Sequence, residues 1–126
     1  MQALDAMRNV YPESNLPLYL HDGFDLERFT KFVASRPDFV VQDHHSYFVF
    51  TPSDSSEPAS DHTTDIQGDI AYSFVQASAQ ERRNLVIDEF SCALTEKSLK
   101  GESDPNQARR DFCTGQTAIY ANATAG

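Results

Sequence analysis

Three short apolar segments of this chain each end in polar side chains that can carry chemistry. The first ends in His-Asp at residues 21–22, the second in Asp-His-His-Ser-Tyr at 43–47, and the third in Asp-Glu at 88–89. Carboxylates and imidazoles can transfer protons, and both can ligate metals. If the three segments are parallel strands, their carboxyl ends meet at one edge of a sheet, where the active sites of parallel α/β proteins lie.

The elements that must position these side chains follow from apolar spacing and from helix stop signals. In chain order, we expect a helix over 1–14, a strand over 17–20, a helix over 25–36, a strand starting at 39–41, a polar loop over 51–64, a helix over 65–76, a helical turn over 79–83, a strand over 84–87 and a helix from 105 onward. Strands that are continuously apolar and alternate with helices predict a parallel sheet covered by helices. The fold class is therefore α/β, in a single domain of 126 residues.

Strand geometry divides the polar residues at 43–47 between the two faces of the strand. Side chains alternate along a strand, so His45 and Tyr47 share one face, and His44 and Ser46 share the other. The same rule separates the two carboxylates at 88–89. One of the two histidines is expected to be a hydrogen-bonded helper that packs under the helices, and alternation alone does not decide which one.

Composition excludes several classes of function. The net charge is −9, from 10 basic and 19 acidic residues, which argues against binding to nucleic acid or to an anionic membrane. The sequence has no apolar run of about 18 residues that could span a bilayer, and its first residues lack the pattern of a signal peptide.

Other kinds of site lack part of the residue pattern that they require. A metal shell of oxygen and nitrogen ligands could be formed by four of the strand-end residues, namely Asp22, Asp43, His45 and Glu89. No helical zinc spacing and no C-x-x-C pair accompany them, so we expect neither a metal nor another cofactor. Ser46 and Ser91 lack the G-x-S-x-G elbow of a serine nucleophile. Cys92 is expected to be buried or disulfide-bonded, with Cys113 as the available partner.

The segments LYLHDGF, DHHSYFVF and NLVIDEFSCALT together resemble the later barrel strands of the fungal exo-β-1,3-glucanases, in family five of the glycoside hydrolases. The resemblance covers nearly the whole chain. It implies a partial TIM (β/α)8 barrel, made of strands five to seven with their flanking helices.

The resemblance also implies roles for five residues. By matching position, Glu89 would be the nucleophile of a retaining glycosidase, and His45 and Tyr47 would line the subsite of the sugar that is cleaved. His44, on the other face of the strand, would then be the supporting histidine. Phe24 and Phe50 would be aromatic walls against which sugar faces stack. On residues alone, Glu89 is also open to a second interpretation, a strand-end carboxylate paired with an arginine.

The chain departs from the family pattern in ways that affect function. Asp88 and Phe90 stand where the family usually has glycine and tryptophan, and no Asn-Glu-Pro supplies the family's acid/base glutamate. The resemblance then implies an incomplete barrel segment over 1–126 that hydrolyses β-glucan weakly or not at all. A non-catalytic carbohydrate-binding or interaction module is the alternative.

Three further expectations follow from the resemblance. The binding partner would be β-glucan or an oligosaccharide, and the location would be extracellular or in the cell wall. Unburied barrel edges would allow the chain to self-associate.

Overall fold

The computed structural model describes residues 2–13, 15–79 and 84–124. Its elements are α1 (Gln2–Val10), β1 (Leu18–His21), α2 (Thr30–Ser35), β2 (Val40–Ser46), α3 (Ala59–Asp65), the π-helical turn η1 (Ile66–Ile70), α4 (Ala71–Ser78), β3 (Leu85–Phe90) and α5 (Pro105–Thr124). The predicted alternation of helices and strands is confirmed. The helical turn expected over 79–83 lies, apart from Ala79, outside the described residues.

The three strands form one open parallel sheet in the order β1-β2-β3. Leu18 of β1 pairs with Val40 of β2, and Gln42 of β2 pairs with Leu85 of β3. The mixed α/β class is thus confirmed. Closure of this sheet into a barrel stays a prediction.

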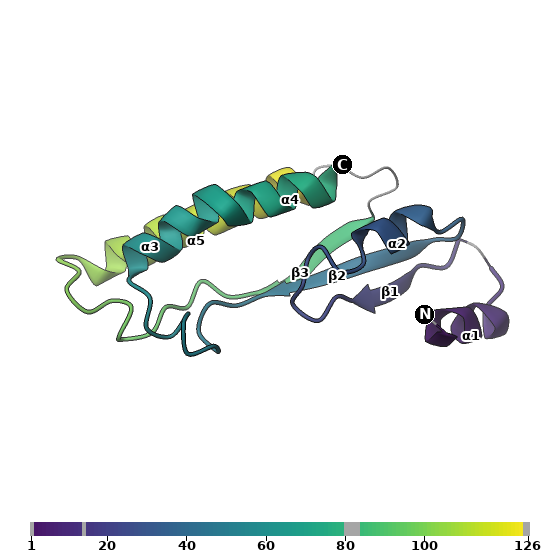
Figure 1. The fold of residues 1–126 in the computed structure, drawn as a ribbon, viewed down its shortest axis with the longest axis horizontal. Helices are drawn as coiled ribbons and strands as arrows, with labels where there is room; N and C mark the ends of the chain where they lie inside the picture. Colours follow the sequence, from purple (N-terminus) through teal and green to yellow (C-terminus); the bar gives the residue numbers. More distant parts are fainter. Residues whose placement is uncertain (1, 14, 80–83, 125–126) are drawn as a thin grey trace.

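The long helices cover one face of the sheet. Figure 1 shows α5 running beside the continuous helix α3-η1-α4, with both above the strands. One apolar cluster, which includes Phe74 and Tyr120, lies between these helices and β3, and a second, which includes Ile66 and Phe112, lies among the helices and the loops beside them. No helix among the described residues is long and apolar enough to cross a membrane.

Three helix boundaries differ from the sequence prediction, the first for a local reason and the other two because of contacts with other parts of the chain. The first helix ends at Val10, since Pro12 disfavours helical geometry in the residue before it. The second begins at Thr30 rather than at 25, because the Leu26 carbonyl accepts hydrogen bonds from the side chains of Thr30 and Gln42. The third begins at Ala59, inside the predicted loop.

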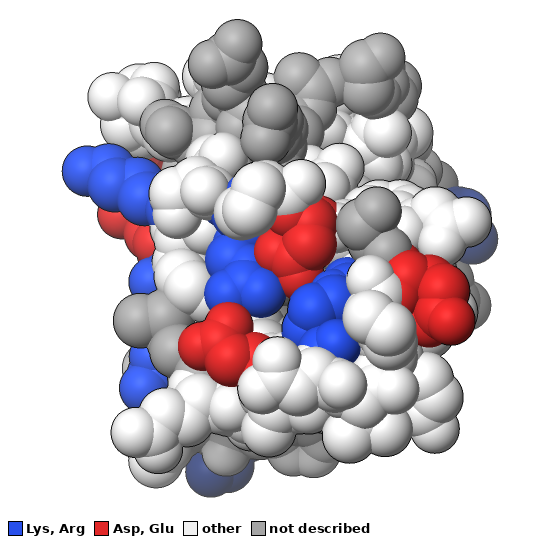
Figure 2. Space-filling view, turned by 90° about the vertical axis from the view of Figure 1, so that its right-hand side faces the viewer, with Lys and Arg blue, Asp and Glu red and all other residues white. Residues whose placement is uncertain are grey.

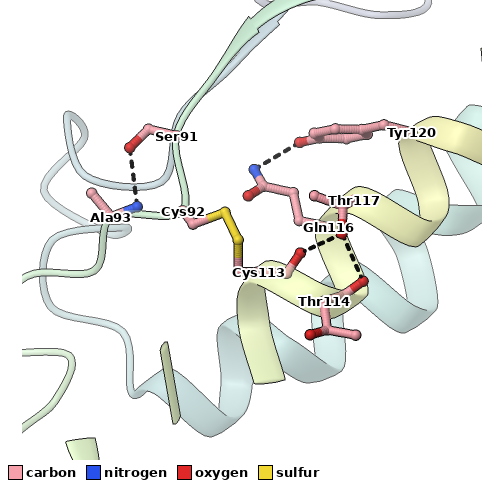
Figure 3. Close-up of a disulfide and its surroundings, with 8 residues drawn as sticks. All are labelled: Ser91, Cys92, Ala93, Cys113, Thr114, Gln116, Thr117 and Tyr120. Atoms are coloured by element: carbon pink, nitrogen blue, oxygen red, sulfur yellow. Dashed lines mark hydrogen bonds between the residues drawn. A yellow bond between two sulfur atoms is a disulfide. The ribbon is translucent and has the colours of Figure 1, made fainter. Parts of the chain in front are cut away.

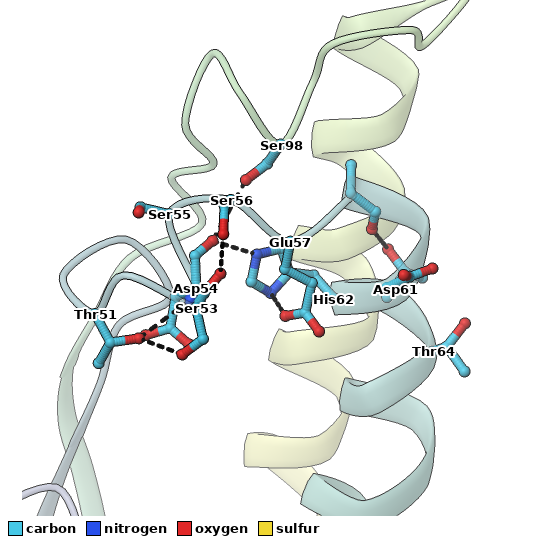
Figure 4. Close-up of polar contacts among 12 residues, drawn as sticks. Thr51, Ser53, Asp54, Ser55, Ser56, Glu57, Asp61, His62, Thr64 and Ser98 are labelled. Atoms are coloured by element: carbon cyan, nitrogen blue, oxygen red, sulfur yellow. Dashed lines mark hydrogen bonds and ion pairs between the residues drawn. The ribbon is translucent and has the colours of Figure 1, made fainter.

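That early start of α3 is explained by a buried histidine. The Nδ1 atom of His62 lies 2.8 Å from Glu57, and its Nε2 atom lies 2.9 Å from the carbonyl oxygen of Asp54 (Figure 4). His62 is 1% exposed, and its ring packs against Phe48 and Phe112. His62 therefore connects the loop after β2 to the helix layer. The polar sequence around it gave no indication that it would be buried.

A disulfide joins the exit of β3 to α5. Cys92 and Cys113 are bonded (2.03 Å), 21 residues apart in the chain (Figure 3). The pairing considered from the sequence is confirmed. The expected start of α5 is also confirmed, because Asp104 accepts hydrogen bonds from the backbone amides of Asn106 and Gln107.

An ion-pair network holds α1 at the amino ends of the strands. Arg8 and Arg36 both bind Asp38, at 2.9 and 2.6 Å, and Arg36 also binds Asp5 at 2.6 Å. Figure 2 shows basic and acidic side chains intermixed on this end of the molecule. The hydrogen bonds from Arg36 and Arg8 lower the pKa of Asp38 well below its ordinary range. This end is stabilised by charge, and the polar residues of the site lie at the other end of the strands.

Candidate active site

The polar carboxyl ends of the three strands lie together at one edge of the sheet. His21 of β1 pairs with Asp43 of β2, and His45 of β2 pairs with Glu89 of β3. The rings of His21 and His45 meet edge to face, with their centres 4.3 Å apart. The convergence predicted from the sequence is confirmed.

A register irregularity places both carboxylates of β3 beside one histidine. The pairing between β2 and β3 shifts between Asp43 and His45. As a result, His45 Nε2 lies 3.0 Å from Asp88 Oδ1, and His45 Nδ1 lies 3.8 Å from Glu89 Oε2. The prediction that alternation separates Asp88 from Glu89 was wrong, because regular alternation does not hold across such an irregularity.

The helix-facing residues of β2 form a buried support. Asp22 is 0% exposed and accepts hydrogen bonds from His44 Nδ1 (2.7 Å), from Gln42 Nε2 (3.0 Å) and from the backbone amide of Phe24 (3.0 Å). The ring of His44 packs edge to face on Phe74. His44 is thus the supporting histidine that the sequence analysis expected, with Asp22 as its partner.

The charge of Asp22 is stabilised by these contacts. Burial alone would raise the pKa of its carboxyl, but the hydrogen bonds from His44 and Gln42 outweigh that effect and lower the pKa from its ordinary value. The four-residue metal shell considered from the sequence is therefore not assembled as written, because Asp22 faces the helices and is occupied there.

The opposite face carries a different group around His45. Its Nε2 atom lies 3.2 Å from Asp43 Oδ2 as well as 3.0 Å from Asp88 Oδ1. Burial and the neighbouring Asp88 carboxylate raise the pKa of Asp43, while His45 opposes this. Sequence reasoning missed Asp88 as a member of this group, although its position beside Glu89 was a signal.

Glu89 is an exposed carboxylate held by a tyrosine. The Tyr47 hydroxyl donates a hydrogen bond to Glu89 Oε1, and the glutamate side chain is 61% exposed. This hydrogen bond raises the pKa of Tyr47 to about 12. None of the ion pairs in the described part of the chain joins Glu89 to an arginine, so the arginine interpretation is not supported.

Two exposed phenylalanines flank Tyr47. Phe24 is 64% exposed and Phe50 is 77% exposed, and their ring centres lie 6.4 and 5.3 Å from that of Tyr47. Phe24 follows Gly23 in a turn where both residues have positive φ, and its amide is held by Asp22. The buried support therefore orients the exposed ring.

A cavity of about 440 Å³ opens beside these rings. Phe24, His45, Tyr47 and Phe50 contribute to its wall. The cavity also reaches the loop after β2 and the helix layer, and the lining residues there that sequence reasoning missed are Asp54 in the loop and Asp69, Ile70, Ser73 and Phe74 in the helices. Two of these, Asp69 and Ile70, belong to the π-helical turn, a distortion that is frequent at functional sites.

Comparisons with known proteins place the chain near one enzyme. It is 33% identical, over 121 residues and 94% of its own length, to the protein named glucan 1,3-beta-glucosidase 3 of Schizosaccharomyces pombe (strain 972 / ATCC 24843). The chain spans 25% of the length of that relative. No protein-family model matches the chain, and no solved structure matches it.

Proposed function

We propose that this chain carries the nucleophile side of a retaining glycoside hydrolase site that acts on β-1,3-glucan, with Glu89 as the nucleophile. The observation that carries the proposal is the contact between Glu89 and Tyr47 beside His45, at a strand end that resembles those of β-1,3-glucanases. The similarity to a protein named as a glucan 1,3-beta-glucosidase supports the choice of substrate.

The geometry suits a sugar at this edge of the sheet. A nucleophilic carboxylate must be ionised and aimed, and the Tyr47 hydroxyl donates to Glu89 in its charged form. His45 lies on the same side and can hydrogen-bond to sugar hydroxyls. Phe24 and Phe50 present exposed rings to the apolar face of a sugar.

The proposal assigns only half of the chemistry to these residues. Retaining hydrolysis needs a second carboxyl group, about 5 to 5.5 Å from the nucleophile, to protonate the leaving oxygen. The sequence contains no Asn-Glu-Pro motif to supply it. We therefore expect this chain by itself to hydrolyse unactivated β-glucan weakly or not at all, since acid catalysis contributes about 10²–10⁴-fold.

The three-stranded sheet fits strands five to seven of a closed barrel. Its strands are parallel, its helices cover one face, and its polar residues gather at the carboxyl ends. An extracellular or cell-wall location is part of the same proposal. The bond between Cys92 and Cys113 supports it, because disulfides persist in oxidising compartments.

Covalent trapping tests the nucleophile without needing the missing acid. A fluorinated glucoside with a dinitrophenyl leaving group requires no protonation to depart, and its fluorine slows release of the glycosyl-enzyme. We expect intact-mass and peptide analysis to find the sugar on Glu89. The label should disappear in Glu89→Gln and persist in Glu96→Gln, a matched control whose side chain is 93% exposed.

The alternative, a carbohydrate-binding module, predicts a different pair of results. The exposed rings of Phe24 and Phe50 would then bind laminarin oligosaccharides with no covalent label, and Glu89→Gln would leave the affinity unchanged. That combination would refute the catalytic assignment of Glu89. Labelling at another carboxylate would refute it as well.

A further inference from the structure

A second group of ligating atoms lies next to the proposed nucleophile and is not explained by it. Asp43, His45 and Asp88 each offer one ligand atom, and these atoms lie within 4.8 Å of one another. The His45 Nε2 atom is central, at 3.2 Å from Asp43 Oδ2 and 3.0 Å from Asp88 Oδ1. This set shares only Asp43 and His45 with the shell considered from the sequence.

Hydrogen bonding within the group leaves polar atoms unsatisfied. The Nε2 atom of His45 can carry one proton, yet it faces carboxylate oxygens of both Asp43 and Asp88. The other oxygen of Asp43, Oδ1, is buried and has no hydrogen-bond partner in the described part of the chain. Buried polar atoms are rarely left without a partner, so the Asp43 carboxylate keeps one unused acceptor.

We propose that Asp43, His45 and Asp88 form a binding site for a divalent first-row transition ion such as Zn²⁺. An ion with tetrahedral bonds of about 2.0–2.1 Å holds neighbouring ligand atoms about 3.3 Å apart. The two separations at His45, 3.2 and 3.0 Å, are close to this value. One imidazole with two carboxylates is also a ligand set that such ions accept.

The ion resolves the shared contact at His45. Its charge offsets the two carboxylates and it takes the lone pair of the imidazole, so Nε2 no longer has to share one proton between Asp43 and Asp88. Asp43 and His45 are two residues apart on β2, and Asp88 comes from the adjacent β3. The Asp88 side chain is 54% exposed, so water can fill the remaining coordination positions.

The ion and a sugar would compete for His45. This consequence rests on the proposed function, in which His45 is a sugar contact, whereas the metal site itself does not. A transition ion would then act as an inhibitor of sugar binding, and Asp88, which stands where the resembling family usually has glycine, would make this chain sensitive to it.

Titration of the metal-free, untagged 126-residue chain tests the site directly. Calorimetry with Zn²⁺ and absorption with Co²⁺ should show saturable binding of one ion for each chain. Asp88→Asn and Asp43→Asn should each weaken it by at least about tenfold, since even the loss of an outer partner of a ligand costs about 10–100-fold. Asp69→Asn, a control that removes a carboxylate from the nearby cavity wall, should bind like the wild type.

The exposed position of Asp88 keeps the test decisive. Its substitution removes a solvent-facing carboxylate, so circular dichroism should show an unchanged fold even if Asp43→Asn fails to fold. No saturable binding, or equal binding by the wild type and Asp88→Asn, would overturn the proposal. If Zn²⁺ binds as expected but laminarin oligosaccharides leave its affinity unchanged, the metal site stands and the competition at His45 is refuted.

Discussion

The buried carboxylate Asp22 offers a sharp test of how the strand ends are held. It accepts hydrogen bonds from His44 and Gln42 through one oxygen and from the amide of Phe24 through the other. The change Asp22→Asn keeps the shape but replaces one acceptor oxygen with a donor. In the better orientation, the new amide nitrogen faces the Phe24 N–H, while the remaining oxygen still accepts the other two hydrogen bonds.

The expected loss of folding stability follows from this arrangement of donors and acceptors. One buried donor loses its partner, at about 1–3 kcal/mol, and two hydrogen bonds lose the strengthening that the charged acceptor gave them. We expect the free energy of unfolding to fall by roughly 2–4 kcal/mol in total at pH 7. For a chain of this size that corresponds to a melting temperature lower by roughly 8–16 °C.

The difference in stability between Asp22→Asn and the wild type should depend on pH. The pKa of Asp22 is lowered in the folded state from the ordinary 3.8, so its stabilising contribution is present above that value. The contribution is lost as pH falls through the folded pKa, because the carboxyl group then becomes neutral. The gap in stability between the wild type and Asp22→Asn should therefore narrow as the solution is acidified below about pH 4.

Urea denaturation followed by circular dichroism, repeated across this pH range, measures both effects. Asp25→Asn is the matched control, because Asp25 lies in the same turn and is exposed. We expect its stability to stay within about 0.5 kcal/mol of the wild type. Equal stability of Asp22→Asn and Asp25→Asn at pH 7, or a gap that does not change with pH, would refute the reasoning.

Two other predictions concern the disulfide and the tyrosine. Replacing Cys92 and Cys113 by alanine should lower the free energy of unfolding by about 3 kcal/mol, the chain-entropy value for a closed loop of this length, and thermal melts of the variant should show it. A variant as stable as the oxidised wild type would contradict this. Ultraviolet titration should find that Tyr47 ionises near pH 12, because its hydrogen bond to Glu89 favours the protonated hydroxyl and the nearby carboxylate opposes a second negative charge. In Glu89→Gln its pKa should return toward 10.0, and an unchanged titration curve would show that the contact does not form in solution.

The order of elements could be predicted because its signals are local. Apolar runs bounded by turn residues identified all three strands, and the Asp104 cap with Pro105 identified the start of α5. The start of α3 could not be predicted in the same way. It depends on His62 contacting the loop before it and on Ala59 donating a backbone hydrogen bond to Ser98, and Ser98 lies far along the chain.

The site was predicted to the level of which strand ends meet, but not to the level of which atoms touch. The alternation rule placed His44 and Ser46 on a common face, and the structure shows that this face meets the helices, where His44 binds Asp22 and Ser46 accepts a hydrogen bond from Tyr120. The same rule failed at 88–89, because it assumes a regular register. A shift in the pairing of two strands depends on both strands at once, and no single segment of sequence encodes it.

The register shift also decides which contacts the polar residues at 43–47 can make. With regular pairing, His45 would face one carboxylate of β3, and a sugar contact would be a sufficient explanation for it. With the shift, His45 lies between Asp43 and Asp88 on one nitrogen and near Glu89 on the other. The two proposals of sugar binding and of cation binding therefore depend on the same imidazole.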